Sequence, residues 1–331
     1  MQNQTIVLAS RPQGEPSADQ FRFETGALPQ PAAGQVLLKT RYVSVDPYMR
    51  GRMNAGKSYV APFEVGQPIS GGIVAEVVES QHDQLPVGSV VVGNLPWQEY
   101  SVSDGAGLTR IPTDKAPISY FLGLLGMPGL TAYFGLLDIC QPKAGETVVV
   151  SGAAGAVGMV VGQLAKIQGA RVIGTAGSDE KVAYLKKLGF DEAINYKTAN
   201  IAEALAAAAP AGVDCYFDNV GGAITDAVYN NLNKNARIAI CGQISMYNAT
   251  EVPVGPRPEG KLLTTSSLMK GFIVSDYHSR WPEGVARLSE WLAEGKLHAE
   301  ETITEGFDQI PAAFLGLFKG ENTGKAIVKM A

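Results

Sequence analysis

The chain has 331 residues, which is enough for two domains that each bury a core. Its hydrophobic share of 46%, charged share of 18% and formal net charge of −5 are typical of a globular protein and give no reason to expect nucleic acid or an anionic membrane as a partner. We expect a small-molecule ligand instead. The three cysteines have no paired spacing and indicate neither a disulfide framework nor a zinc knuckle, so a reducing cytoplasm is the expected location.

Residues 1–122 predict an irregular, mostly β domain. Short β-rich pieces at 35–41, 72–78 and 89–92 are separated by turns that contain proline and glycine. Residues 45–52, VDPYMRGR, are predicted to form a loop that carries Tyr48, and Tyr59 follows in a second loop. Because loops on a rigid scaffold often carry substrate contacts, both tyrosines are candidates for the substrate side. The amino terminus lacks a basic flank followed by a long apolar core, and we expect no signal peptide.

Two uncharged runs, residues 120–137 and 147–165, approach the length of a membrane span. Glycines interrupt both runs and no basic cluster flanks them, so we expect no span. The first run contains LGMPGLTAY, which predicts the start of a helix at the seam between two domains. Met127 is a candidate substrate contact and Thr131 a candidate cofactor contact, although interdomain core explains apolar residues at helical spacing equally well.

Residues 147–158, TVVVSGAAGAVG, predict a buried parallel strand, a tight turn and a helix. Glycine at such a turn lets the main chain bend sharply and lets a pyrophosphate approach it, while the free N–H groups at the start of the helix face the phosphates. The candidate cofactor contacts here are Gly152, Gly155, Ala156, Val157 and Gly158. The spacing is G-x-x-G-x-x-G rather than G-x-G-x-x-G, so a turn without a ligand remains an alternative for the motif taken alone.

Strand-like and helix-like segments alternate after this turn. Strands are predicted at 171–175, 213–219 and 237–241, with helices at 179–188 and 224–232. Alternation of this kind indicates a parallel sheet with helices on both faces, which is a Rossmann doubly wound α/β fold. Right-handed crossovers place the carboxyl ends of all strands on one side, where the ligand binds.

The strand predicted at 171–175 ends in TAGS and has no carboxylate at its tip. Folds that prefer NAD place an acidic residue there to hold the ribose hydroxyls, so the sequence predicts NADPH. Ser178 is a good N-cap for the next helix, and Lys181 in its first turn is a cation where the helix dipole disfavours one. A phosphate partner would offset that cost. An ordinary solvated lysine is the alternative interpretation of Lys181.

Eight motifs in fixed order resemble the zinc-independent medium-chain dehydrogenase/reductases over nearly the whole chain. They are MPGLTAY, VVVSGAAGAVG, GSDEKVAYLKKLGF, NYK, FDNVGG, CGQISMYN, GFIV and ENTGKAIV. VDPYMRGRM and CGQISMYN make the chain more closely similar to the prostaglandin and alkenal double-bond reductases, and among those to the bacterial NADPH-dependent curcumin reductases. The resemblance implies a GroES-like substrate and catalytic domain at 1–122, completed by 301–331, and a Rossmann NADPH-binding domain at 123–300.

The resemblance also implies further cofactor contacts and a homodimer. The positions that match family contacts are Lys181 and Tyr196 for the 2′-phosphate, Asn219, Cys241 and Gly242 on the ligand side of the sheet, and Asn322 near the nicotinamide. For Cys241 a small buried strand residue is expected rather than a redox thiol. An apolar strand predicted at 271–274 would support a dimer if it formed a sheet edge.

No metal site is expected. Metal-dependent relatives need a cysteine, a histidine and further ligands for catalytic zinc. Residues 42–46, YVSVD, stand where those relatives carry the first cysteine, and His82, His278 and His298 are isolated from one another in the sequence.

The expected function is NADPH-dependent reduction of the C=C bond of α,β-unsaturated ketones or aldehydes. Hydride transfer to the β-carbon gathers negative charge on the carbonyl oxygen, and a neutral phenol can donate a hydrogen bond to it. Tyr247 is the first candidate and Tyr59 the second, although each of these tyrosines could instead be an aromatic wall of the pocket. The alternatives are quinone reduction and NADPH binding without turnover.

Overall fold

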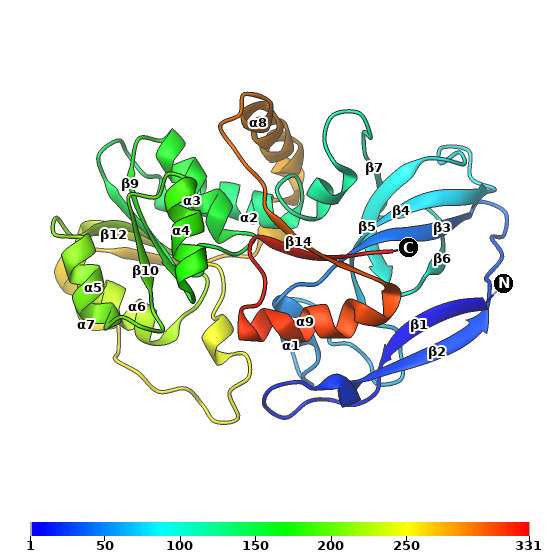
Figure 1. The fold of residues 1–331 in the computed structure, drawn as a ribbon, viewed down its shortest axis with the longest axis horizontal. Coiled ribbons are helices and arrows are strands. Elements are labelled where there is room, and N and C mark those ends of the chain that lie inside the picture. Colours follow the sequence, from blue (N-terminus) through cyan, green and yellow to red (C-terminus); the bar gives the residue numbers. More distant parts are fainter. Residues whose placement is uncertain (1, 331) are drawn as a thin grey trace. The chain divides into compact units, whose positions relative to one another are not determined.

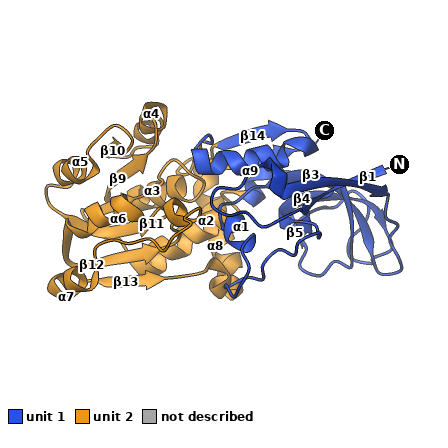
Figure 2. Cartoon of the chain, turned by 90° about the horizontal axis from the view of Figure 1, so that it is seen from below, with its two compact units in different colours: residues 1–122, 301–322, 326–331 blue, residues 123–300, 323–325 orange. Residues whose placement is uncertain are grey.

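The structure is a computed structural model that describes residues 2–330, which divide into two compact units (Figures 1 and 2). The first unit contains the chain up to Leu122, Glu301–Asn322, and the chain from Ala326 onward. The second unit contains Gly123–Glu300 and Thr323–Lys325. The chain therefore leaves the first unit after Leu122 and returns to it at Glu301, with three later residues that belong to the second unit.

The first unit is built mainly on antiparallel strands. Its larger sheet has the order β14-β15-β3-β4-β5-β7 with β6 paired to β3, and β1 and β2 pair separately. Its strands are Gln2–Leu8 (β1), Phe21–Ala27 (β2), Val36–Ser44 (β3), Ser70–Ser80 (β4), Val90–Pro96 (β5), Tyr100–Ser103 (β6), Thr109–Arg110 (β7), Glu301–Glu305 (β14) and Lys325–Lys329 (β15). Its helices are Ala18–Gln20 (η1), Tyr48–Arg52 (α1), Ile118–Leu122 (η2), Phe307–Gln309 (η6) and Ile310–Lys319 (α9).

The core of the first unit lies between this sheet and α9. Val36 and Leu38 of β3 are fully buried in this core, and Leu37 between them is buried as well, so both faces of the strand are covered there. Phe314 of α9 packs edge-on against Trp97 with ring centroids 6.4 Å apart. Helix α9 is amphipathic and buries this face, so the carboxyl-terminal segment completes the core of the unit.

The second unit contains a six-stranded parallel sheet with the order β10-β9-β8-β11-β12-β13. The strands are Thr147–Val150 (β8), Arg171–Ala176 (β9), Glu192–Asn195 (β10), Val213–Asp218 (β11), Leu232–Ile240 (β12) and Leu268–Gly271 (β13). The first strand is central and the chain winds outward in both directions, which confirms the predicted doubly wound fold. The order reverses between β8 and β11, where a ligand is expected to bind in such folds.

Helices cover both faces of this sheet (Figure 1). Ile173 of β9 faces Leu205 of α5 and Val228 of α6 in one apolar cluster, while the next residue, Gly174, lies against Leu185 of α4. Successive residues of a strand point to opposite faces, so both sides are buried. The helices are Met127–Phe134 (α2), Gly135–Cys140 (η3), Gly158–Ile167 (α3), Asp179–Lys187 (α4), Ile201–Ala208 (α5), Gly222–Tyr229 (α6), Ile244–Met246 (η4), Glu259–Thr265 (α7), Val274–Arg280 (η5) and Trp281–Ala293 (α8).

The prediction of an apolar strand at 271–274 was wrong. The edge strand β13 is Leu268–Gly271, and it pairs in register with residues 237–240 of β12. All four of its residues are exposed, whereas Phe272, which follows the strand, is buried. Hydrophobicity identified the buried residue, but the position of the strand is set by pairing with β12.

Two other predicted boundaries differ from the structure. The predicted loop at 45–52 contains the short helix α1, because Pro47 already has the helical φ of −58° at its N-cap position. The helix predicted to reach residue 232 ends at Tyr229, and β12 begins at Leu232 rather than at Arg237. The first half of β12 has no alternating apolar pattern, since Leu232 and Asn233 are only half-buried and the next two residues are exposed.

No helix within residues 2–330 is long and apolar enough to span a bilayer. The two uncharged runs are instead divided among short elements. Residues 120–137 run from η2 through α2 into η3, and residues 147–165 contain β8, the glycine turn and most of α3.

Candidate active site

The turn between β8 and α3 is shaped by glycine. Gly152 has the left-handed φ of +59°, which glycine adopts without strain. A Cβ atom placed on Gly158 would come within 2.7 Å of Ala153 Cα, so any larger residue would push the first turn of α3 away from the loop. The start of the helix therefore packs directly on the turn that precedes it.

Backbone N–H groups at the start of α3 are available to a ligand. Met159 and Val160 donate their N–H groups to Gly155 O and Val157 O within the turn and helix. Within residues 2–330 no group accepts a hydrogen bond from the N–H of Ala156 or Val157, and both residues are only half-buried. Two donors at a helix N-terminus suit phosphate oxygens, so the turn fits the pyrophosphate of a dinucleotide.

The fully buried carboxylate of Asp218 lies at the end of β11. Its Oδ1 accepts hydrogen bonds from Ser151 Oγ at 3.0 Å, from Tyr216 Oη at 2.9 Å and from the N–H groups of Val220 and Gly221 at 3.0 and 2.9 Å. Its Oδ2 accepts from a threonine hydroxyl of α6, Thr225 Oγ1, at 2.8 Å. A buried charge is tolerated only when its hydrogen-bonding capacity is satisfied, and this one is.

Asn219 joins the two loops at the switch point of the sheet. Its side-chain Nδ2 donates to Ser151 O at 2.8 Å, and its backbone N–H donates to Ser151 Oγ at 2.9 Å. The loop after β11 is therefore held against the loop after β8 by two hydrogen bonds to one residue. This is the ligand side of the sheet, where the sequence predicted Asn219 to lie.

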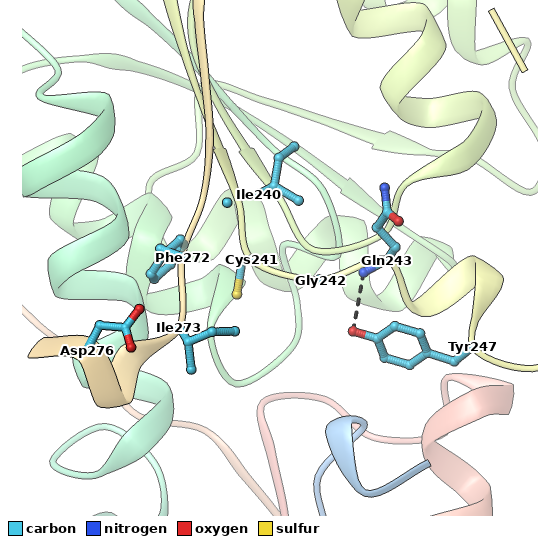
Figure 3. A pocket seen from close by; sticks show the side chains of 9 residues that line it. Ile240, Cys241, Gly242, Gln243, Tyr247, Phe272, Ile273 and Asp276 are labelled. Carbon is cyan, nitrogen blue, oxygen red and sulfur yellow. Dashed lines mark hydrogen bonds between the residues drawn. The ribbon is translucent and has the colours of Figure 1, made fainter. Parts of the chain in front are cut away.

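A cavity of about 410 Å³ opens beyond the ends of β12 and β13 (Figure 3). Cys241 and Gly242 line it from the β12 side, together with Tyr247, and Phe272 and Ile273 line it from the β13 side. Burial, with a smaller contribution from the Asp218 carboxylate, raises the pKa of the Cys241 thiol to about 12. The thiol therefore stays protonated near neutral pH, which argues against a redox thiolate. Cys241 directly follows β12 and is half-buried, so it is not the buried strand residue that the sequence predicted.

The Tyr247 hydroxyl points toward Gly242 in this cavity (Figure 3). The backbone N–H of Gln243 donates to Tyr247 Oη at 3.3 Å, and no described residue accepts the tyrosine's own O–H. A Cβ on Gly242 would lie 3.0 Å from Tyr247 Oη, so glycine at this position leaves room for the tyrosine side chain. Burial raises the pKa of the Tyr247 phenol, which keeps the proton on the oxygen for donation.

A second group of predicted residues lies at the end of β9. Ser178 is the N-cap of α4 and accepts a hydrogen bond from the N–H of Lys181 at 3.3 Å. Tyr196, which follows β10, donates its N–H to Ala176 O at 3.1 Å and is 39% exposed. Gly177 lies between them, and a Cβ there would be 2.9 Å from Tyr196 Oη. The structure thus brings Lys181 and Tyr196 to the same strand end.

Met127 and Thr131 lie one turn apart in α2. Thr131 is buried, and its hydroxyl donates to Met127 O at 2.7 Å within the helix. The Thr131 hydroxyl can therefore accept a hydrogen bond from a ligand but has no further hydrogen to donate. Met127 is half-buried and belongs to the second unit, as do the predicted cofactor residues other than Asn322.

Tyr48, Tyr59 and Asn322 belong to the first unit. Burial, followed by the Asp46 carboxylate, raises the pKa of the Tyr48 phenol, and the nearby Tyr59 raises it further. Tyr48 is half-buried at the start of α1, while Tyr59 is 61% exposed on the loop that follows the helix. The two tyrosines therefore lie close enough for their phenols to interact.

No three histidine, cysteine, aspartate or glutamate side chains between residues 2 and 330 are arranged to hold a metal ion.

Sequence reasoning missed Ser151, Asp218 and the cavity wall at Phe272 and Ile273. Asp218 directly precedes Asn219 in FDNVGG, and GFIV contains the two wall residues, so both motifs were noted without a role for these positions. An acidic residue at the end of an apolar strand was the available signal, because a carboxylate placed there must find buried donors.

Comparisons with known proteins match the whole chain. Residues 4–111 match the model described as the N-terminal domain of oxidoreductase, and residues 156–290 match that of the zinc-binding dehydrogenases. YfmJ of Bacillus subtilis, named an NADP-dependent oxidoreductase, is 63% identical over 99% of this chain and 98% of its own. Mouse prostaglandin reductase 1 is 50% identical over 99% of both chains. The NADPH-dependent curcumin reductase of Escherichia coli is 46% identical over 99% of this chain and 97% of its own.

The fold also matches solved structures. CurA from Vibrio vulnificus in complex with NADPH has a TM-score of 0.95, with 46% identity over 99% of both chains. A quinone oxidoreductase of Pseudomonas syringae, at 22% identity and a TM-score of 0.78, shares the fold alone.

We predict that Asp218→Asn lowers the free energy of unfolding of the second unit by about 2 to 3 kcal/mol, because hydrogen bonds to a buried charge become hydrogen bonds to a neutral amide. Urea denaturation measures the loss. The control is Asp214→Asn in the same strand, where a half-buried carboxylate accepts only from Thr147 N and Asn233 Nδ2. Equal losses in the two variants would show that the hydrogen bonds of Asp218 contribute no more to the free energy of unfolding than those of Asp214.

Proposed function

The chain belongs to the medium-chain dehydrogenase/reductase family, in the branch of prostaglandin reductase 1 and NADPH-dependent curcumin reductase, and we propose that it reduces the C=C bond of enones and enals with NADPH. The observation that carries the proposal is the protonated Tyr247 hydroxyl, which faces a cavity at the ligand side of a Rossmann sheet. The phenol can donate to an oxygen that gains charge during reduction.

The residues at the strand ends fit a dinucleotide. The pyrophosphate would lie on the turn of residues 152–158, which contains Gly152, Gly155 and Gly158. The N–H groups of Ala156 and Val157 would donate hydrogen bonds to it. Ser178, Lys181 and Tyr196 would hold the adenosine ribose and its 2′-phosphate, beside a strand tip without a carboxylate. Asn219, Cys241 and Gly242, with Thr131, would contact the nicotinamide half.

NADPH, when bound, supplies a hydride to the β-carbon of the unsaturated carbonyl compound. Tyr247 donates a hydrogen bond to the carbonyl oxygen as the enolate forms, and its raised pKa keeps it neutral until then. The Asp218 network keeps the Asn219 loop and the glycine turn in register, so the residues that orient the cofactor do not need to reorganise.

The first unit is proposed as the substrate domain. Residues 1–122 with 301–331 supply Tyr48 and Tyr59, of which Tyr59 is the second candidate donor, and Met127 of residues 123–300 is a further substrate contact. Three free cysteines support a location in the reducing cytoplasm.

An absorbance assay at the NADPH band tests the reaction. Purified protein is given NADPH with an enal, a diaryl enone or a quinone. Oxidation of NADPH with the first two, with the saturated ketone or aldehyde as product, is expected. Turnover of the quinone alone would favour the quinone reductases instead, and NADPH binding without any turnover would indicate a non-catalytic binding protein.

Tyr247→Phe should lower kcat by roughly tenfold or more and change KM little, because only a contact made in the transition state is lost. Steady-state kinetics with an enone measures both constants. Tyr229→Phe is the control. The Tyr229 hydroxyl contacts Met269 Sδ, and the variant should have the kcat and KM of wild type. A normal kcat in Tyr247→Phe with a raised KM in Tyr247→Ala would make Tyr247 a wall residue and move the donor role to Tyr59.

Lys181→Ala should weaken NADPH binding by about tenfold to a hundredfold, as expected for one charge-assisted phosphate contact. NADH, which lacks the 2′-phosphate, should bind the variant as it binds wild type. Fluorescence titration of each nucleotide checks the prediction. If the affinities for NADPH and NADH fall by the same factor, Lys181 does not contact the 2′-phosphate.

Activity is expected to be independent of zinc. Prolonged dialysis against a chelator should leave kcat unchanged, and metal analysis of the active protein should find less than one zinc per chain. Loss of activity that added zinc restores would contradict the proposal.

A homodimer is proposed on the edge strand β13. All four of its residues are exposed, including Leu268 at 53% and Met269 at 37%. An exposed strand edge with apolar side chains favours pairing with a symmetry-related copy. Light scattering at micromolar concentration should give twice the chain mass of 34.9 kDa. A monomer mass would rule the dimer out.

A further inference from the structure

Lys197 is a cation that follows β10 and lies beside Gly177 at the end of β9. It directly follows Tyr196, and its backbone N–H donates to Asn195 Oδ1 at 3.1 Å. A Cβ atom on Gly177 would lie 3.3 Å from Lys197 Cε as well as 2.9 Å from Tyr196 Oη. The side chains of Tyr196 and Lys197 therefore lie next to the position that a Cβ atom of residue 177 would take, and a larger residue there would displace them.

Lys181 approaches the same place from α4. Burial is the main cause that lowers the pKa of its ammonium group, and the charge of Lys197 is the second. The two cations are thus close enough to repel each other across the end of β9. Holding like charges together is unfavourable unless an anion lies between them.

The nearby carboxylates do not neutralise Lys197. Asp179 Oδ1 accepts a hydrogen bond from Asn195 Nδ2 at 2.7 Å, and the pKa of the Glu180 carboxyl is lowered by its own backbone N–H and by the Ser178 hydroxyl rather than by a lysine. Across the described chain the Lys197 ammonium has no ion pair with a carboxylate. The strand tip therefore presents two lysines and a phenol around a glycine, with no acidic side chain bound to Lys197.

We infer that Lys197 is a second cationic residue for the 2′-phosphate of NADPH and acts with Lys181 and Tyr196 to set the preference over NADH. The inference rests on the proposed use of NADPH. A phosphate monoester carries a charge of about −1.5 to −2 near neutral pH, which one lysine does not balance. Gly177 leaves the room that this group needs, since any side chain there would meet Tyr196 and Lys197 first.

The test uses adenosine fragments, so that binding is measured without turnover. Calorimetry gives the affinities of 2′,5′-ADP and of 5′-AMP, which lacks the 2′-phosphate, for wild type, Lys197→Ala and Lys197→Arg. Because Lys197 is exposed, Lys197→Ala should weaken 2′,5′-ADP by about threefold to tenfold and leave 5′-AMP unchanged. Lys197→Arg, which keeps the charge, should restore most of the affinity.

Lys187→Ala is the matched control, since it removes the same charge from an exposed site in the last turn of α4. It should leave both affinities unchanged. A Lys197→Ala variant that binds 2′,5′-ADP like wild type, or that loses both fragments equally, would overturn the inference while NADPH use stands. If wild type binds neither 2′,5′-ADP nor NADPH, the proposed function itself fails and this inference fails with it.

Discussion

The buried carboxylate of Asp218 is the constraint on which the ligand side of the second unit depends. An unsatisfied charge in this position would be strongly destabilising, so the chain must bring donors to it from three places: the glycine turn, its own strand, and the loop and helix that follow. Satisfying the charge fixes Ser151 against the end of β11. Asn219 is fixed by the same arrangement, since it binds Ser151 through both its backbone and its side chain. The protein's own hydrogen bonds therefore hold the switch point in place.

The two ends of the proposed nucleotide site are built differently. At the proposed pyrophosphate and nicotinamide end, close packing holds the glycines, and the Tyr247 hydroxyl accepts a hydrogen bond from the Gln243 N–H. At the adenosine end, Tyr196 and Lys197 are exposed side chains around Gly177, and charge rather than packing would recognise the ligand. The rigid end suits chemistry that needs fixed geometry, whereas the charged end suits discrimination between nucleotides that differ by one phosphate.

Local sequence was a good guide wherever a pattern reflects local chemistry. The run TVVVSGAAGAVG predicted a strand, a turn and a helix because buried parallel strands are continuously apolar and tight turns need glycine. The same reasoning failed at β13 and at the start of β12. The residues of β13 are exposed, and they form a strand only because β12 offers hydrogen bonds. Early β12 lacks alternation and pairs with β11 at Leu232, after which the register shifts and resumes at Arg237. Pairing partners far apart in the chain leave no local signal.

The sequence by itself determined the doubly wound sheet, the glycine turn and the absence of a carboxylate at the tip of β9, since each follows from residue types at short spacing. Only the tertiary structure decided that Asp218 is the centre of a buried network, that Tyr247 Oη lies against Gly242, and that Lys197 shares the space above Gly177 with Tyr196. The physical reason is that satisfaction of a buried charge and convergence of side chains are properties of three-dimensional distance. Residues from different strand ends acquire them only when the sheet has formed.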